Sequence, residues 1–553
     1  MSSEIGNRQS AIGNSLHVVL VAAENAALKG GKEGGMGDVI QGLSKALTVK
    51  GVKVTVITPS YGFLHTQNPS TFVETISFTF RGEEYSGELW KVNEAGDCMQ
   101  LLFEHPEIRG NPLYYDDPSD TPFARDATKF ALFCSAVGTY LKGIKKPFTL
   151  HLHDWHTANL FMLAELHPDF TFLRELPTLF TIHNLSIQGT RPMMGNPSSL
   201  ETWFPELFHE TGWISLWKDP RYADACYTPM AAGIRFADKV NTVSPSYAEE
   251  ILKPSDGESG LVRGEGLEEF LQNAAAGKRL FGILNGIDYP NRERVDESPS
   301  TQNKTLLFQK ITSEVRKWIS ATSDADVIAE CEDILFRLGR LQTDGTGMVL
   351  TSVGRIVDQK VRLFLQRGSG GDAAIESILE SLEERKGALI VLGSGDTWFE
   401  GAFRAVAKAS RRFVFINRYS SSLADALYLH GDLFLMPSLY EPCGISQMLA
   451  MRESQPCLVH RTGGLKDTVR NMETGFTFEG ENPQEMADAF ATSLKNALEL
   501  FSNNKSRWQQ ICANARKQRF TWEVAAERYL ELIVSNSPPQ PPLLQERRRP
   551  DQQ

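Results

Sequence analysis

Leu16-His-Val-Val-Leu-Val-Ala-Ala23 is an almost unbroken apolar run of the length of one strand, which indicates a parallel strand buried on both faces. A glycine-rich loop, Lys29–Gly37, follows this run, and a segment with helical periodicity extends from Asp38 to Leu47. Val52–Thr58 is the next apolar strand. The order strand, loop, helix and strand predicts the beginning of a doubly wound α/β domain.

Apolar runs followed by helical patterns return in the second half of the chain. Repeated βα units with Gly or Ser at the strand ends predict a second parallel sheet. A chain of 553 residues is also too long for one ordinary core, so two domains are expected. The expected strands of the second sheet are Met348–Gly354, Ala388–Gly393, Phe413–Ile416, Leu433–Pro437 and Pro456–His460.

The boundaries follow from these patterns. We expect a first domain over 16–288 and a second over 289–520. The segment 293–342 is polar and poorly patterned apart from helical stretches at Thr305–Ser320 and Ala325–Leu338, so we expect a surface excursion there. The polar start of the chain, 1–15, and its proline-rich end, 535–553, are expected to be disordered tails.

Composition limits the classes of function. The net charge of −11 argues against a nucleic-acid-binding protein, and no stripe of Lys and Arg interleaved with aromatic residues offsets it. The seven cysteines are scattered without a Cys-x-x-Cys pair, which is typical of reduced thiols. No apolar run is long enough for a membrane span, and residues 1–15 are polar and lack the apolar core of a signal peptide. We therefore expect a cytoplasmic protein with no membrane partner.

One acidic loop stands out. Ser438-Leu-Tyr-Glu-Pro-Cys-Gly-Ile-Ser-Gln447 follows a predicted buried strand, and Glu441 comes directly before a Pro-Cys-Gly turn that is expected to open a helix. The first N–H groups of a helix have no partner within the helix and attract anions. The loop therefore combines a lone carboxylate with a place to hold an anionic ligand.

Two cations stand just beyond another predicted strand, in Gly354-Arg-Ile-Val-Asp-Gln-Lys360. Arg355 offers a planar fork and Lys360 a point charge, so the two can converge on one pyrophosphate. An acidic chain with an anionic substrate needs such a local positive cluster. The alternative interpretation is ordinary solvated surface charge.

The glycine-rich loop contains Lys32-Glu-Gly-Gly-Met-Gly-Asp38. Gly34 and Gly35 would let backbone N–H groups approach a phosphate, Lys32 would add charge, and Asp38 could hold a sugar hydroxyl. The loop lacks the spacing of a dinucleotide site and the Gly-Lys-Ser/Thr ending of a P-loop. A purely structural turn is the alternative.

His151-Leu-His-Asp-Trp-His156 has a composition that suggests metal ligands. A binuclear hydrolase would need His-x-His-x-Asp-His, and here the Asp and its neighbour are transposed. On an extended segment His151 and His153 share one face, whereas Asp154 points away from it. We therefore expect no metal site, and a metal hydrolase is kept only as an alternative.

These segments together resemble those of the bacterial glycogen synthases and plant starch synthases. The resemblance runs from about Val18 to Glu531. It implies a GT-B fold, in which two Rossmann-like doubly wound domains face each other across a cleft and a helix at 521–534 crosses back to the first domain. It also includes Phe180-Thr-Ile-His-Asn-Leu-Ser-Ile-Gln-Gly189, Gly282-Ile-Leu-Asn-Gly-Ile-Asp288 and Arg461-Thr-Gly-Gly-Leu-Lys-Asp467.

The resemblance also implies roles for the catalytic residues. Glu441 would orient the glucose and stabilise positive charge at its reacting carbon. Arg355 and Lys360 would neutralise the departing nucleoside diphosphate. His183 would lie against the donor glucose, and Asp154 would contact the donor or the acceptor sugar.

Further residues are assigned to the donor or the acceptor by the same resemblance. Tyr419 falls where the family stacks the adenine ring, and Tyr114 falls on the acceptor side. Extra residues at Lys29-Gly-Gly precede the glycine-rich loop, and Lys32 is favoured as the site lysine because it keeps the spacing to the glycines. The donor-binding residues would be Lys32, Gly34, Gly35, Asp38, Asn285, Tyr419, Cys443, Gly444, Ser446, Gly463 and Gly464.

The chain departs from the family pattern in three places besides these extra residues. Val361 replaces a glycine after Lys360, Leu439 replaces a polar residue, and the segment after Asp288 continues as Tyr289-Pro-Asn-Arg. The last of these departures predicts an altered connection between the domains.

The implied reaction is transfer of an α-glucosyl group from ADP-glucose to the non-reducing end of an α-1,4-glucan with retention of configuration. Neither a cofactor nor a metal is expected. Two alternatives stay open beside the metal hydrolase. One is a GT-B enzyme that uses UDP-glucose or another donor and acceptor. The other is a weakly catalytic glucan-binding or regulatory homologue.

Overall fold

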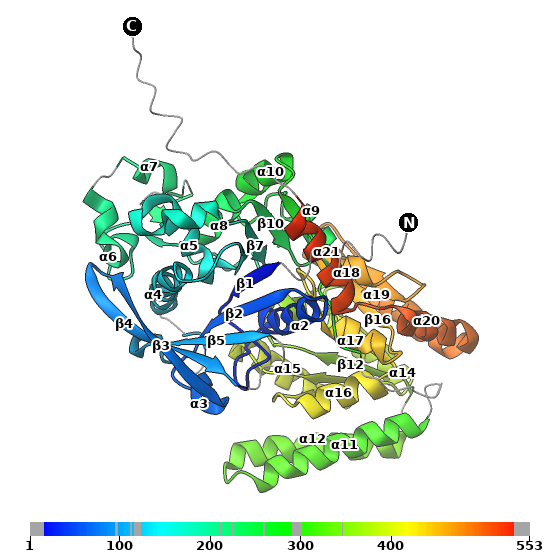
Figure 1. The fold of residues 1–553 in the computed structure, drawn as a ribbon. Helices are drawn as coiled ribbons and strands as arrows, with labels where there is room; N and C mark the ends of the chain where they lie inside the picture. The colour runs from blue at the N-terminus through cyan, green and yellow to red at the C-terminus, as the bar shows by residue number, and fades with distance from the viewer. Residues whose placement is uncertain are drawn as a thin grey trace. The chain divides into compact units, whose positions relative to one another are not determined.

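Figure 1 shows the computed structural model of the chain, which describes residues 16–93, 98–110, 113–115, 123–209, 212–219, 221–222, 225–257, 260–289, 301–345 and 347–535. The chain divides into two compact units. Unit 1 comprises Met1–Pro254, Gly264–Gly286 and Thr521–Gln553, and unit 2 comprises Ser255–Arg263 and Ile287–Phe520. The tails expected at 1–15 and 535–553 lie outside the described residues, apart from Ser535.

Unit 1 is built on one mixed sheet. Its strand order is β11-β10-β7-β6-β1-β2-β5-β4-β3, with parallel pairing from β11 to β5 and antiparallel pairing of β5 with β4 and of β4 with β3. The bounds are β1 His17–Val21, β2 Lys53–Pro59, β3 Ser70–Phe80, β4 Glu83–Val92, β5 Met99–Glu104, β6 Thr149–His153, β7 Thr178–Ile182, β10 Lys239–Thr242 and β11 Leu280–Gly282. A short pair, β8 Arg191–Pro192 and β9 Cys226–Tyr227, lies apart from this sheet.

Helices cover the parallel strands of unit 1, which explains why these strands are apolar throughout. Every residue of β1 from Val18 to Val21 is fully buried, as expected for a parallel strand covered on both faces. The helices are α2 Gly35–Val49, α3 Leu64–Gln67, α4 Ala124–Leu141, α5 Trp155–Leu166, α6 Leu200–Trp203, α7 Ile214–Trp217, α8 Pro229–Phe236, α9 Pro245–Glu250, α10 Glu268–Ala276 and α21 Trp522–Val534, with short 3-10 turns at Pro106–Ile108, Pro168–Glu175 and Pro205–His209.

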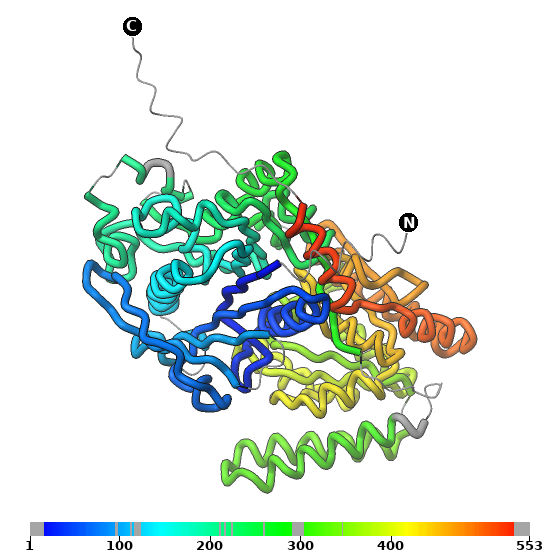
Figure 2. Tube along the Cα trace, viewed as in Figure 1, coloured from blue at the N-terminus to red at the C-terminus, as the bar shows by residue number. Residues whose placement is uncertain are grey.

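The last helix belongs to the first unit. Figure 2 shows α21, in red, beside α2, in blue. The two helices meet at Gly42, where an added Cβ would lie 2.0 Å from Cε2 of Trp522. Trp522 and Tyr529 are both buried in the core of unit 1. A glycine on α2 is therefore what allows the indole ring to dock.

Unit 2 contains a fully parallel sheet in the order β14-β13-β12-β15-β16-β17. The parallel α/β architecture expected for both halves is therefore confirmed. The strands are β12 Val349–Val353, β13 Ala388–Leu392, β14 Phe413–Ile416, β15 Leu433–Met436, β16 Cys457–His460 and β17 Gly475–Phe478. The helices are α11 Thr301–Ser320, α12 Ala325–Asp344, α13 Asp358–Leu365, α14 Ala374–Glu384, α15 Thr397–Ala409, α16 Ser421–His430, α17 Ser446–Arg452, α18 Gly463–Thr468, α19 Pro483–Asn503 and α20 Lys505–Lys517.

The polar segment at 293–342 is more than a surface excursion. From residue 301 onward it lies in α11 and α12, and one face of this helix pair belongs to a core cluster of unit 2. Leu307, Ile311 and Val315 on α11 are fully buried, and Leu338 on α12 is almost fully buried. The two helical stretches were predicted, but only about one residue in three or four of such a helix faces the core, so the polar remainder favoured a surface excursion.

No helix among the described residues is both long enough and apolar enough to cross a membrane.

Candidate active site

The acidic loop of unit 2 lies at the carboxyl end of β15, and α17 begins at its far end, at Ser446. The side chain of Glu441 is 6% exposed, and its carboxylate forms an ion pair with the ammonium group of Lys360. Lys360 stands in the first turn of α13, which follows β12. The structure therefore brings together two of the predicted catalytic residues, from neighbouring strands of one sheet.

The start of α13 also holds the backbone of the acidic loop. Nε2 of Gln359 donates to the carbonyl oxygen of Tyr440 at 3.0 Å. The carbonyl oxygen of Gln359 accepts the N–H of Leu439 at 2.8 Å. Glu441 is thus fixed relative to Lys360 by backbone contacts as well as by charge. Leu439 keeps this function although it departs from the family pattern, because only its backbone takes part.

Two further side chains that the sequence did not single out complete the support of this loop. Nδ1 of the buried His460 bonds to the carbonyl oxygen of Ser438 at 2.9 Å. Nε2 of Gln447 donates to the carbonyl oxygens of Cys443 and Gly444, at 3.2 and 3.1 Å. Gln447 is the last residue of the quoted motif, and this position is the sequence signal that could have identified it.

The glycines at the start of α18 pack directly on the acidic loop. An added Cβ on Gly463 would lie 1.9 Å from the carbonyl oxygen of Glu441, and one on Gly464 would lie 2.3 Å from that of Cys443. The N–H of Gly464 donates to the carbonyl oxygen of Glu441 at 3.0 Å. The structure gives both glycines a packing role, and donor contact by them stays a prediction.

The other donor-site candidates of unit 2 are more open. Arg355 is exposed directly after β12 and forms no ion pair or side-chain hydrogen bond within the described part of the chain. Tyr419 is 72% exposed between β14 and α16. Gly444 adopts a positive φ of 74°, and Ser446 bonds to the hydroxyl of Tyr428. An exposed cation and an exposed ring suit an incoming anionic, aromatic ligand.

Helix α11 supports the loop that carries Tyr419. The guanidinium group of Arg418 lies 5.8 Å from the ring centre of Trp318 on α11. The hydroxyl of Ser420 donates to the carboxylate of Glu314 at 3.2 Å. The segment expected to be a surface excursion therefore contributes to the surroundings of a candidate site residue.

In unit 1 the glycine-rich loop is fixed by a carboxylate that was not among the predicted site residues. Glu24, only 4% exposed, accepts the N–H groups of Glu33 and Gly34 at 3.1 and 2.7 Å. It also accepts the hydroxyl of Tyr114 at 2.8 Å. The N–H of Gly34 is therefore engaged within the chain, whereas space around Gly35 is open. A carboxylate directly after an apolar strand was the available signal.

Lys32 and Asp38 form an ion pair at 2.6 Å across the start of α2. Both side chains are substantially exposed, so water screens this pair. A ligand can compete for either group.

Asp154 lies between β6 and α5 in a strained conformation, with φ at +54°. Its carboxylate accepts the backbone N–H of His183 at 2.7 Å, and it is 5% exposed. Burial raises the pKa of Asp154 to about 8, and the nearby Glu24 adds to this effect. The sugar contact assigned to Asp154 stays a prediction, and the structure gives its side chain a role in holding the His183 loop.

The histidines beside Asp154 form a neutral cluster. The His151 and His153 rings lie 4.1 Å apart between their centres, and Nδ1 of His153 is 2.9 Å from Nε2 of His183. Burial lowers the pKa of His151 and that of His183 to about 3, and it lowers the pKa of His153 well below its usual range. Among the residues described, no three or more His, Cys, Asp or Glu side chains are grouped to hold a metal ion.

Asn285 lies just beyond β11 in unit 1 and is 5% exposed. Its amide oxygen has no hydrogen-bond partner within the described part of the chain. An unpaired buried amide oxygen is costly, and the donor contact assigned to Asn285 stays a prediction.

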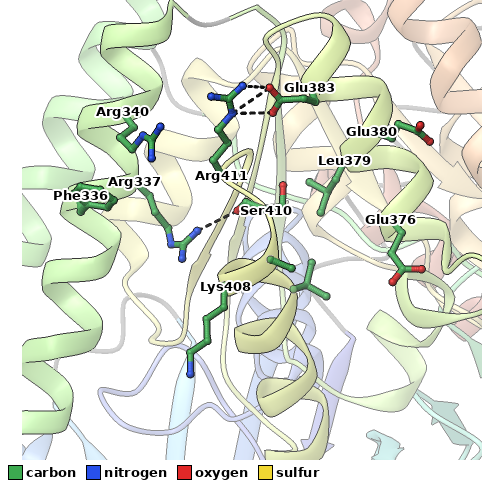
Figure 3. A pocket seen from close by; sticks show the side chains of 12 residues that line it. Phe336, Arg337, Arg340, Glu376, Leu379, Glu380, Glu383, Lys408, Ser410 and Arg411 are labelled. Carbon is green, nitrogen blue, oxygen red and sulfur yellow. Dashed lines mark hydrogen bonds and ion pairs between the residues drawn. The ribbon is translucent and has the colours of Figure 1, made fainter.

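A cavity of about 710 Å³ in unit 2 lies away from these residues. It is lined by α12, α14 and the end of α15, close to the amino ends of β13 and β14. Figure 3 shows Arg411 directed at both carboxylate oxygens of Glu383, and Arg337 bonded to the carbonyl oxygen of Ser410. No predicted site residue lines this cavity.

The raised pKa of Asp154 predicts a pH dependence of stability. Between its ordinary pKa and about 8, the folded chain keeps a proton that the unfolded chain has lost, so stability falls as pH rises. The lowered pKa values of the histidines change the free energy of unfolding only below about pH 6.5. From pH 6.5 to 8 we expect Asp154 to lower the free energy of unfolding by up to about 1.4 kcal/mol per pH unit.

Urea denaturation of the protein and of Asp154→Asn at several pH values tests this expectation. The amide keeps an acceptor oxygen for the N–H of His183 but does not titrate. The unfolding free energy of Asp154→Asn should vary less with pH in this window. Parallel curves for the two proteins would contradict the assignment.

Two family descriptions match the chain. Residues 17–273 match the starch synthase catalytic domain, and residues 348–496 match the glycosyl transferases group 1. The first match lies in unit 1, apart from Ser255–Arg263, which belong to unit 2, and the second match lies in unit 2. Each unit is therefore recognised separately.

Relatives span almost the whole chain. A glycogen synthase of Gloeobacter violaceus is 32% identical over 94% of this chain and 99% of its own length, and one of Clostridioides difficile is 31% identical over 90% and 96%. The catalytic domain of starch synthase IV from Arabidopsis thaliana, solved with ADP and acarbose, has a TM-score of 0.70 at 24% identity and covers 94% of this chain and 99% of its own. The expected GT-B fold is thereby confirmed. The chain belongs to the glycogen synthase and starch synthase family of glycosyltransferases.

Proposed function

We propose that the protein transfers the α-glucosyl group of ADP-glucose to the 4-hydroxyl at the non-reducing end of an α-1,4-glucan, with retention of configuration. The observation that carries this proposal is the pair of Lys360 and Glu441, fixed by Gln359 and Gly464 at the carboxyl edge of the unit 2 sheet. Ligands of open α/β sheets bind at this edge.

The charges at this edge suit a departing diphosphate. Arg355 and Lys360 would stabilise the negative charge that grows on ADP as its bond to the glucosyl carbon breaks, a preorganised electrostatic role. Glu441 would bind the glucose and stabilise the positive charge at that carbon. The ion pair with Lys360 holds this carboxylate in place.

An adenine nucleotide is favoured by two observations. The ring of Tyr419 is exposed and can stack on a base. The starch synthase IV catalytic domain, which shares the fold, was solved with ADP.

A front-face displacement accounts for retention with one carboxylate. The acceptor hydroxyl approaches the glucosyl carbon on the face from which ADP departs. The bond from this carbon to the phosphate oxygen breaks, the bond to the acceptor oxygen forms, and the acceptor proton passes to the departing phosphate. No second carboxylate is needed as a nucleophile, in contrast to the covalent route of retaining glycosidases.

Transfer of labelled glucose onto glycogen tests the donor. We expect incorporation from ADP-glucose to exceed that from UDP-glucose, in a product that an amylase specific for α-1,4 links degrades. We expect EDTA to leave the rate unchanged, since Arg355 and Lys360 take the part that a metal plays in other transferases. Faster transfer from UDP-glucose would overturn the donor assignment, and no transfer from either would overturn the activity.

Gly463→Ala is expected to lower turnover by about 10²-fold, because a small displacement of a catalytic group is enough for such an effect. It is also expected to destabilise unit 2 by about 1–3 kcal/mol, because the added Cβ overpacks against the backbone. The added Cβ would meet the carbonyl oxygen of Glu441 at 1.9 Å, at a residue whose φ is +42°. The loop carrying Glu441 must shift to make room. Steady-state kinetics measure the effect, and circular dichroism checks the fold.

Gly354→Ala is the matched control for Gly463→Ala. An added Cβ there meets nothing within 4 Å, and Gly354 also follows a strand on this edge. Equal losses in the two variants would show that the contact with Glu441 is not the cause.

A further inference from the structure

The His183 loop is held from two sides. Asp154 accepts its backbone N–H at 2.7 Å. His153, at the end of β6, holds its ring through the 2.9 Å contact of Nδ1 with Nε2 of His183. The backbone contact fixes where the loop lies, and the ring contact decides which nitrogen of His183 carries a proton.

Both rings are neutral at physiological pH, because burial lowers both pKa values. A hydrogen bond between two neutral imidazoles needs one donor and one acceptor, which leaves two arrangements. Either His153 donates from Nδ1 and His183 accepts at Nε2, or the roles are reversed.

The surroundings of His153 distinguish these arrangements. Its Nε2 is buried and has no hydrogen-bond partner in the described part of the chain. If His183 donated, the proton of His153 would sit on this atom as a buried N–H without an acceptor, which is rare in folded proteins. If His153 donates, Nε2 carries only a lone pair. Donation by His153 therefore avoids the orphaned donor.

The proton of His183 then has to be on Nδ1. This atom bonds to no described residue. Nδ1 of His151 and Nδ1 of His156 also lack a partner, but they are enclosed, whereas Nδ1 of His183 is not. His183 is also only partly buried. Its Nδ1–H therefore remains available to a ligand.

We propose that His153 is a positioning residue that locks His183 in the Nδ1–H tautomer, so that His183 offers a hydrogen-bond donor to a hydroxyl oxygen of the bound sugar. The identity of the ligand as a sugar rests on the proposed function. The tautomer does not, because it follows from contacts within unit 1.

The tautomer is measured directly by nitrogen NMR on the full chain labelled with ¹⁵N-histidine. Protonated and bare nitrogens of a neutral imidazole have widely separated shifts, and the His183 signals are assigned by their loss in His183→Gln. We expect a protonated Nδ1 in the wild type and a mixture of tautomers in His153→Leu. A wild-type His183 protonated on Nε2 would overturn the proposal, whether or not the protein transfers glucose.

The kinetic consequence is tested with the rescue variant His153→Asn, whose amide nitrogen can donate from about the position of Nδ1. We expect kcat/KM to fall about tenfold in His153→Leu, the effect of one lost hydrogen bond to the ligand. His153→Asn should recover most of this loss. If both variants unfold at the same urea concentration and lose activity equally, His153 fills space and sets no tautomer.

Discussion

Lys360→Ala is expected to lower turnover on the order of 10³-fold, the scale of removing one preorganised charge that meets the transition state. The residue acts in two ways in the structure. It would face the departing diphosphate, and it forms the ion pair that holds Glu441, whose side chain is 6% exposed. The variant loses the cation and leaves a nearly buried carboxylate without its partner. Single-turnover and steady-state assays with ADP-glucose measure the effect.

Arg362→Ala is the matched control, because Arg362 is a cation on the same helix that pairs with Asp358 and is 45% exposed. We expect less than about a twofold change for it, as is usual for exposed ion pairs. Glu441→Gln should lose about as much as Lys360→Ala, and the double variant should lose little more, because residues that act as a unit are not additive. Near-normal turnover of either single variant would refute the role given to that residue.

Trp522→Ala is expected to destabilise unit 1 by about 3–5 kcal/mol, the usual cost of truncating a buried tryptophan. Gly42→Ala should be destabilising too, by about 1–3 kcal/mol, because its Cβ would lie 2.0 Å from the indole ring. In the Trp522→Ala background, however, the same glycine change should be neutral or stabilising by up to about 1 kcal/mol. There the added methyl group meets a cavity, and alanine is the better helix former.

Calorimetry and urea denaturation of the four proteins in this cycle measure the coupling between the two positions. Gly401→Ala on α15 is the control, since its added Cβ meets nothing within 4 Å and only helix propensity should act. If Gly42→Ala costs the same with and without Trp522, the contact between α2 and α21 is not what the glycine serves.

The parallel sheets were predictable because buried parallel strands are apolar on both faces. Val18–Val21 and Leu433–Met436 show this pattern in the sequence and are fully or almost fully buried in the structure. The pairing of α11 and α12 with the unit 2 core was not predictable in this way. Their buried residues recur at helical spacing, but periodicity does not say which core an amphipathic face will pack against, and the stretch as a whole is polar.

Motifs located the site loops but did not separate residues that face a ligand from residues that hold one another. Gly463 and Glu441 belong to separate motifs. Only the folded chain shows that the backbone of Glu441 leaves no room for a side chain at position 463. Glu24 was missed for the same reason, since its partners Gly34 and Tyr114 come from separate segments. Contacts between loops depend on geometry that no single motif contains.

The placement of α21 has a consequence for biosynthesis. Unit 1 includes β1 at His17, yet its core also includes Trp522 and Tyr529, which the ribosome adds only after the described residues of unit 2. Every described residue of unit 2, by contrast, has been synthesised once Phe520 is added. Domains usually fold in the order in which they are made. Here unit 1 keeps an unfilled groove beside Gly42 until α21 has been made, whereas unit 2 can finish packing before that helix is added.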